Sequence, residues 1–276
     1  MPAALEETRR RPVPACSVLA VHSPHRRLLA VVAFATVLAC GGGGGGGGGT
    51  AGDTSHPPPG TASGASSALV ARGVVAALPP GTLLISASDL SAAPGATPDP
   101  PATSGILYVV KGAARLSGAS SQDLKTGEGA FVDSQSRPKL SNPGAAGAEW
   151  YYIATQAAAD RASPPTLAGS QRLFASGDLP PLPRINQAEA LQQVTLQPGG
   201  RTEGYRPNGV ELFIGLQGTV EVRASTLGAP MSLSSGQAAL VLEGTAVQVL
   251  NRGSRPAAYL TFFLLPDGTA LTRPDH

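Results

Sequence analysis

The sequence predicts an all-β protein with two tandem β-barrels, which follow an N-terminal export signal and a disordered tether. Its composition, with Gly 35, Pro 26 and only 14% charged residues, favours turns and short strands over long helices. The apolar residues form short runs between Gly, Pro and Asn breakers, and no long stretch has the 3.6-residue period of a helix. The same pattern occurs twice along the 276 residues, which predicts two barrels or sandwiches in one chain.

The first 39 residues are typical of an export signal. Arginines at positions 9–11 and 26–27 precede an apolar run of twelve residues at 28–39. This run is shorter than the roughly 20 residues that span a bilayer, and it suits the apolar part of a signal peptide. The run ends in the letters VLAC, which resemble the lipobox of bacterial lipoproteins. That resemblance implies cleavage before Cys40 and lipid attachment to its sulfur. The alternatives are an ordinary signal peptide or a free cysteine.

Residues 40–67 form the expected tether. Positions 41–49 are an unbroken run of nine glycines, and the segment continues with Gly, Ser, Pro and Thr, a composition that cannot bury a core. We therefore expect the cell envelope as the location and the membrane as a partner, reached through the lipid on Cys40. Gly41 stands where retained lipoproteins carry aspartate, so the resemblance implies the periplasmic leaflet of the outer membrane in a diderm cell. In a single-membrane cell it implies the cell surface.

An internal repeat organises the rest of the chain. A shift of 104 residues aligns positions 68–95 with 172–199 without a gap, so that Leu78 and Pro79 meet Leu182 and Pro183. Further along, Gly127 meets Gly236 after small insertions. The repeat predicts two domains, residues 68–165 and residues 166–276.

Each copy consists of short apolar runs that predict strands. In the second copy these runs lie at 212–216, 220–222, 238–242, 247–250 and 259–265, and in the first copy a clear one lies at 106–110. Residues 187–193 have the composition of a helix, yet the repeat aligns them with 83–89, which reads as a strand. The sequence leaves these two interpretations open.

The second copy resembles a cupin. Cupin motif one has the form G-x5-H-x-H-x3-E-x6-G, and motif two has the form G-x5-P-x-G-x2-H-x3-N. The spacing of motif one is kept by Gly199, Tyr205, Pro207, Glu211 and Gly218. The spacing of motif two is kept by Gly236, Leu242, Gly244, Val247 and Asn251. The resemblance implies a two-domain cupin, or bicupin, with two jelly-roll barrels of the RmlC-like type.

The first copy departs further from the cupin motifs. Its second motif keeps only the end residues, Gly127 and Asn142. In its first motif, Pro101 and Thr103 occupy the histidine positions and Gly105 stands in the place of the glutamate.

The metal ligands of the family are missing from both copies. Cupin metals are held by three histidines and a carboxylate, but the second copy has Tyr205, Pro207 and Val247 at the histidine positions. The four histidines of the chain lie at positions 22, 25, 56 and 276, outside the expected barrels. We therefore expect no metal, no other cofactor and none of the family's metal-dependent activities.

Tyr205 and Glu211 remain as candidate ligand-binding residues in the second barrel. Three roles stay open for Glu211. It could be a structural carboxylate held by a tyrosine, water or an arginine, with Arg201, Arg206 and Arg223 as the candidates. It could bind a small polar molecule together with Tyr205. It could also perform acid–base chemistry with Tyr205, although no barrel histidine is available to share it and no catalytic residue is assigned.

The sequence thus favours a small-molecule-binding or protein-interaction module over an enzyme, without settling the question. One alternative is a metal-independent enzyme that uses Glu211 and Tyr205 on a carbohydrate or another small polar substrate. The other is a structural or assembly cupin without a ligand. A homodimer through the barrel sheets is a further expectation from the family. Nucleic acid is not an expected partner, because the net charge is only +2 and the arginines are scattered.

Overall fold

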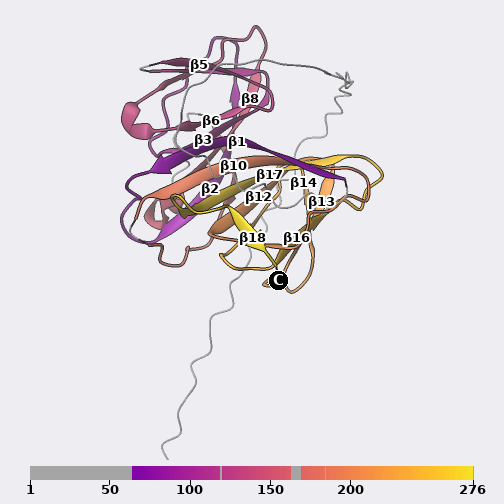
Figure 1. Cartoon of the computed structure of the whole chain (residues 1–276). Helices are drawn as coiled ribbons and strands as arrows, with labels where there is room; N and C mark the ends of the chain where they lie inside the picture. The colour runs from indigo at the N-terminus through magenta and orange to yellow at the C-terminus, as the bar shows by residue number, and fades with distance from the viewer. Residues whose placement is uncertain (1–63, 119, 163–168, 184, 276) are drawn as a thin grey trace, which may run out of the picture.

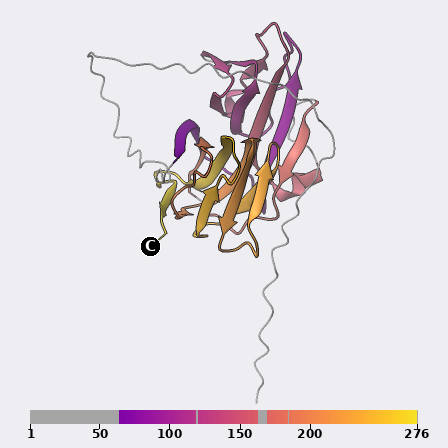
Figure 2. The same cartoon turned by 90° about the vertical axis from the view of Figure 1, so that its right-hand side faces the viewer.

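The computed structural model describes residues 64–275 except 119, 163–168 and 184. The expected signal peptide, Cys40 and most of the tether lie outside these residues. The described part is almost entirely β, with two short 3-10 helices, η1 (Ser134–Ser136) and η2 (Ala158–Ala162). Two β-barrels lie against each other (Figures 1 and 2). The fold class that the sequence predicts is therefore confirmed.

Barrel one consists of a five-stranded and a three-stranded sheet. The large sheet has the order β6 (Gly129–Val132), β3 (Gly105–Lys111), β8 (Ala148–Ala157), β2 (Leu83–Ala92) and β9 (Gln171–Ala175). The small sheet has the order β5 (Ser121–Lys125), β4 (Ala113–Ser117) and β7 (Lys139–Ser141).

Barrel two consists of two five-stranded sheets. Its first sheet has the order β1 (Ala65–Val75), β10 (Gln187–Leu196), β17 (Ala257–Pro266), β12 (Val210–Gln217) and β15 (Ala238–Val241). Its second sheet has the order β14 (Met231–Ser234), β13 (Thr219–Ala224), β16 (Val247–Leu250), β11 (Tyr205–Pro207) and β18 (Thr272–Pro274).

The two halves of the chain exchange their first strands. Strand β1 precedes barrel one in sequence but pairs with β10 of barrel two, whereas β9 precedes barrel two and pairs with β2 of barrel one. Figure 1 shows the indigo β1 beside the orange β10. The repeat reveals two similar units, but it does not show which sheet each first strand joins. That choice depends on contacts between residues far apart in the chain.

The repeat is reproduced in the register of the strands. Strands β2 and β10 begin and end 104 residues apart, as the ungapped alignment requires. Asn142 and Asn251 also make the same contacts. Each side-chain amide donates to three backbone carbonyls, which belong to Ala92, Ala93 and Ala146 in barrel one and to Leu196, Gln197 and Arg255 in barrel two.

The helix-like composition of residues 187–193 is misleading, because this segment begins strand β10. The strand pairs with β1 on one side and β17 on the other, so its backbone groups are satisfied in the sheet. Its alternate side chains enter two different cores. Pairing with both neighbouring strands therefore overrides the helical propensity of this segment, which amounts to about 0.5 kcal/mol per residue.

Alternation along the strands separates three main cores. Side chains such as Trp150 and Tyr152 fill barrel one, and Phe213 and Tyr259 fill barrel two. The opposite faces of the two large sheets pack on each other and form the core between the barrels. In the segment 205–211, Tyr205 packs into the core of barrel two and Val210 packs into the core between the barrels.

Candidate functional site

Tyr205 and Glu211 meet inside barrel two. Tyr205 lies on β11 and Glu211 on β12, and the two side chains are only 2% and 0% exposed. The Tyr205 hydroxyl donates to Glu211 Oε1 at 2.8 Å, and the Thr261 hydroxyl donates to the same oxygen at 2.6 Å. A tyrosine, water or an arginine were the partners considered for a structural Glu211 carboxylate, and the structure shows a tyrosine, Tyr205.

Two of the three arginines named as candidate partners, Arg206 and Arg223, bind elsewhere. Arg206 pairs with Asp275 and donates to the Gly244 carbonyl, and Arg223 pairs with Glu221. Alternation along β11 explains this, because Tyr205 and Pro207 point into the barrel while Arg206 points outward.

Strand register places two further polar residues on the same interior face. Gln192 of β10 stands opposite Thr261 of β17, and Tyr259 lies two residues before Thr261 on that strand. Both side chains are buried. Within the described residues, Glu211 Oε2, Gln192 Oε1 and the Tyr259 hydroxyl oxygen are buried atoms without a hydrogen-bond partner. The interior of barrel two therefore has unused hydrogen-bonding capacity around the Tyr205–Glu211 pair.

Burial controls the protonation of this group. It raises the pKa of Glu211 to about 8, because desolvation outweighs the hydrogen bonds from Thr261 and Tyr205. Burial, with the negative field of Glu211 added, also raises the pKa of Tyr205 and of Tyr259 well above the ordinary range. Near neutral pH all three groups hold their protons, and Glu211 is mainly a carboxylic acid that can donate a hydrogen bond.

The predicted motif positions come together, but they do not fit a metal. Tyr205 and Val247 are cross-strand partners on β11 and β16, and both lie in the same interior core as Tyr259. Pro207 is buried on β11 and, like Val247, has no donor atom. A family-type metal needs imidazole nitrogens beside its carboxylate, whereas the side chains that contact Glu211 are tyrosine and threonine hydroxyls. Across the described part of the chain, no cluster of three His, Cys, Asp or Glu residues could hold a metal ion.

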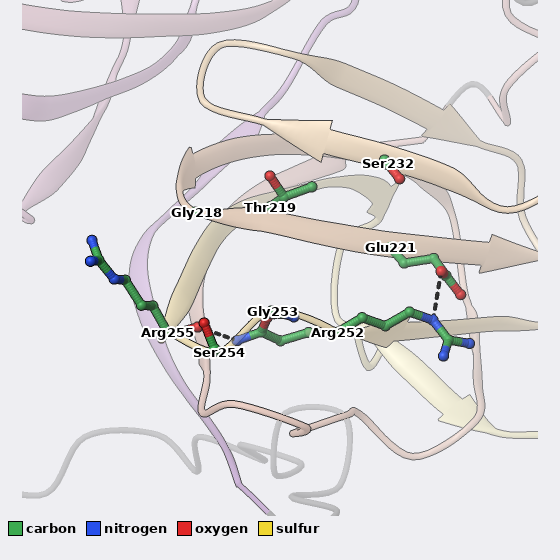
Figure 3. Close-up of a pocket in the computed structure, with 9 residues that line it drawn as sticks. Gly218, Thr219, Glu221, Ser232, Arg252, Gly253, Ser254 and Arg255 are labelled. Carbon is green, nitrogen blue, oxygen red and sulfur yellow. Dashed lines mark hydrogen bonds and ion pairs between the residues drawn. The ribbon is translucent and has the colours of Figure 1, made fainter. Parts of the chain in front are cut away.

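Two hollows lie elsewhere on the molecule. One, of about 310 Å³, lies on the outside of barrel two along residues 218–221 and 251–255 (Figure 3). There Glu221 pairs with Arg252, while the Arg255 side chain points away from the groove. The other, of about 680 Å³, lies between the Pro-rich segments that precede β2 and β10. Neither hollow includes Tyr205 or Glu211 in its lining.

Sequence reasoning missed Thr261, Gln192 and Tyr259 as members of this polar group. Period-2 alternation could have placed Thr261 and Tyr259 on one face of their strand, since they are two residues apart. It could not have placed that face beside Glu211, because the pairing of β12 with β17 joins residues about 50 positions apart.

Comparison with known proteins supports the fold. No family model matches the chain, and no curated protein sequence matches it significantly. Solved structures do match. The oxalate decarboxylase of Lactobacillus farciminis, in its formate complex, is 15% identical, with 71% of this chain and 80% of that chain covered and a TM-score of 0.50.

A structure of Bacillus subtilis oxalate decarboxylase, from a study of its Mn(II) centres, is 16% identical, with 69% of this chain and 71% of that chain covered and a TM-score of 0.50. AerE from Microcystis aeruginosa is 13% identical, with 71% of this chain and 98% of that chain covered and a TM-score of 0.48. At such low identity, the likeness to the two oxalate decarboxylases shows the fold alone. The protein has the fold of a two-domain cupin.

A search of the described residues for helices that are long and apolar enough to cross a membrane finds none.

Proposed function

We propose that this protein is an exported, membrane-anchored bicupin that binds a small polar molecule inside barrel two without a metal. One observation carries the proposal: three buried polar atoms, on Glu211, Gln192 and Tyr259, lack partners around the Tyr205–Glu211–Thr261 contacts. A buried polar atom without a partner costs about 1–3 kcal/mol. Such groups are retained where water or a ligand supplies the missing hydrogen bonds.

Binding fits this group better than catalysis. Glu211 and Tyr205 could exchange protons in principle, but burial raises the pKa of both, so both are mainly protonated near neutral pH and neither is poised to accept a proton as a general base. Thr261 supplies a further hydroxyl, yet no base lies against it except the Glu211 carboxyl. The metal-independent enzyme is therefore one outcome of the test below and not the proposal.

The test is a thermal-shift screen of the purified protein with polyols, sugars, amines and carboxylates. We expect at least one class to raise the melting temperature, because a ligand that binds only the folded state stabilises it, and the stabilisation grows with the logarithm of the ratio of ligand concentration to Kd. Tyr205→Phe should weaken that shift, since it removes a donor to Glu211. Tyr152→Phe in barrel one is the matched control and should keep the ligand-induced shift. No shift with any class would contradict ligand binding, and turnover of a bound compound would establish the enzyme instead.

The proposed anchor has its own test. Cys40→Ser should move the protein from the membrane fraction to the soluble fraction, because lipid attachment requires the thiol. A serine variant that stays in the membrane fraction would contradict lipidation at this position. Cys16→Ser is the control and should leave the fractionation unchanged.

A further inference from the structure

We infer that residues 267–275, the strap, close one end of barrel two and admit an uncharged, hydroxyl-bearing molecule to the polar group when they lift. The inference rests on the proposed ligand site and adds its gate and the chemistry of its ligand. The strap leaves β17 at a turn where Gly268 has φ +78°, and it ends in β18, which pairs with β11.

Leu271 of the strap covers an apolar end of the barrel interior. It packs against a separate cluster of buried side chains on β10 and β17, made up of Ala188, Ala190, Phe263 and Leu265. Strand register places this cluster directly next to the polar group. Phe263 stands opposite Ala190 on one side and opposite Glu211 on the other. The strap therefore closes the end of barrel two at which Glu211 lies.

The strap is held by the outward-facing residues of the same segment that carries Tyr205. Arg206 pairs with Asp275 at 2.7 Å. The Asn208 backbone donates to the Leu271 carbonyl, its side chain donates to the Ala270 carbonyl, and Arg273 donates to the Asn208 side chain. The segment 205–208 thus places Tyr205 in the polar group with its inward side chain and holds the strap with the outward side chains of Arg206 and Asn208.

The contacts that hold the strap are weaker than the strand pairing within the rest of barrel two. Strand β18 pairs through three residues at the edge of its sheet, whereas β10 and β17 pair through ten. The Arg206–Asp275 pair is partly exposed, at 40% and 32%, and such pairs contribute little. A short edge strand held by solvent-exposed contacts opens locally at a lower free energy than global unfolding. The strap can therefore lift while the barrel stays folded.

The polar group selects the chemistry of the ligand. No arginine, lysine or histidine is among the buried residues of the described chain, so an anion would enter without a counter-charge. The Glu211 acid and the Tyr259 hydroxyl each have a proton to donate, while Gln192 Oε1 accepts. A hydroxyl both donates and accepts, so a polyol can satisfy all three atoms. An ammonium group only donates.

The test measures opening without a ligand. In the full chain with Cys16→Ser and Cys40→Ser, which removes both native thiols, Ala190→Cys places a reporter under the strap and Ala154→Cys places a matched reporter in barrel one. Reaction with a small thiol reagent is followed with and without Leu271→Ala. We expect the reaction at position 190 to become about tenfold faster and the reaction at 154 to change less than about twofold, because local opening costs less than global unfolding. Asp275→Asn, which keeps the packing of Leu271, should accelerate position 190 alone by a smaller factor.

Two results would overturn the strap. Equal acceleration at both positions would mean global opening, and no acceleration with either substitution would mean that the strap does not control access. The ligand is tested separately with glycerol, inositol and glucose against matched carboxylates and amines in the thermal-shift screen. Labelling as expected without a polyol shift would overturn the ligand and keep the strap. A polyol shift with unchanged labelling would overturn the strap and keep the ligand.

Discussion

Barrel one and barrel two share the topology of their large sheets but fill the same interior positions differently. In barrel two, Glu211 stands between Val241 and Phe263, and in barrel one Gly105 stands between Val132 and Ala154 at the equivalent register. The sequence-derived equivalence of Gly105 with the glutamate position therefore agrees with the pairing of the strands.

A tyrosine fills the space that this glycine leaves. Tyr152 of barrel one occupies the ladder position of Thr261, and its hydroxyl donates to the Thr103 carbonyl at 2.5 Å beside Gly105. Barrel two has the reverse arrangement, with a small threonine beside a long glutamate. The shared strand register thus fixes where the side chains point. The sizes of the two side chains at these positions decide whether the interior holds a packed aromatic ring or a polar group.

The outer sheets differ as well. Barrel two has β11 and β18, which carry Tyr205 and the strap, whereas the described small sheet of barrel one consists only of β5, β4 and β7. The polar group and its cover are therefore found together in the same barrel.

The largest difference between the barrels should appear as a pH dependence. The pKa of Glu211 is about 8 in the folded protein against an ordinary 4.5, so the folded state keeps a proton that the unfolded chain releases. This contribution to stability is complete below pH 4.5 and is lost as pH rises to about 8. Glu211→Gln mimics the acid and should remove up to about 1.4 kcal/mol per pH unit of that slope, or about 4 kcal/mol between pH 5 and 8, in urea unfolding.

Glu189 provides a second test of the same reasoning. It is buried between the barrels, where its Oε1 accepts a hydrogen bond from the Thr155 hydroxyl. Burial raises its pKa to about 8 as well. Glu189→Gln should remove a second, independent part of the slope. An unchanged slope in the Glu211→Gln protein would show that this carboxyl is already ionised in the fold.

The glycine of barrel one should resist any side chain. A Cβ at Gly105 would lie 2.4 Å from the Ile153 carbonyl oxygen and 2.9 Å from the Tyr152 hydroxyl. Gly105→Ala should therefore lower the free energy of unfolding by about 3 kcal/mol through overpacking. Gly118→Ala is the control, since its nearest atom lies at 4.0 Å, and it should unfold as the parent does. Similar stability of the two variants would show that barrel one adapts freely.

Replacing either of the two equivalent asparagines, Asn142 or Asn251, should lower the free energy of unfolding by the same amount. Asn251→Ala leaves three backbone carbonyls without their amide donor, and Asn142→Ala does the same in barrel one. We expect a loss of about 2 kcal/mol for each in chemical denaturation, because buried carbonyls lose their partners. A large inequality between the two would contradict a common frame.

The smallest effect is expected at the surface. Glu221 receives hydrogen bonds from Arg223 and Arg252 in the groove on the outside of barrel two, and these partners hold its pKa below the ordinary value. Glu221→Gln should change the free energy of unfolding by less than about 0.5 kcal/mol, because water screens exposed ion pairs. A larger loss that persists in high salt would indicate that the groove is less hydrated than its exposure implies.

Much of the fold could be predicted from the sequence. Motif spacing gave the correct frame around Tyr205 and Glu211, and the repeat gave the equivalence of β2 with β10, even where composition suggested a helix. These features depend on local patterns, since alternation and glycine turns are properties of neighbouring residues.

The sequence by itself determined that the chain is all-β and doubled, and that histidines are missing from the expected metal positions. Only the tertiary structure decided that β1 and β9 exchange sheets, that Thr261 holds Glu211, and that Leu271 covers the barrel end beside it. The reason is physical. A strand's own residues specify which faces it must bury, but its partner is chosen by the summed packing and hydrogen bonding of segments distant in the chain, which no local pattern records.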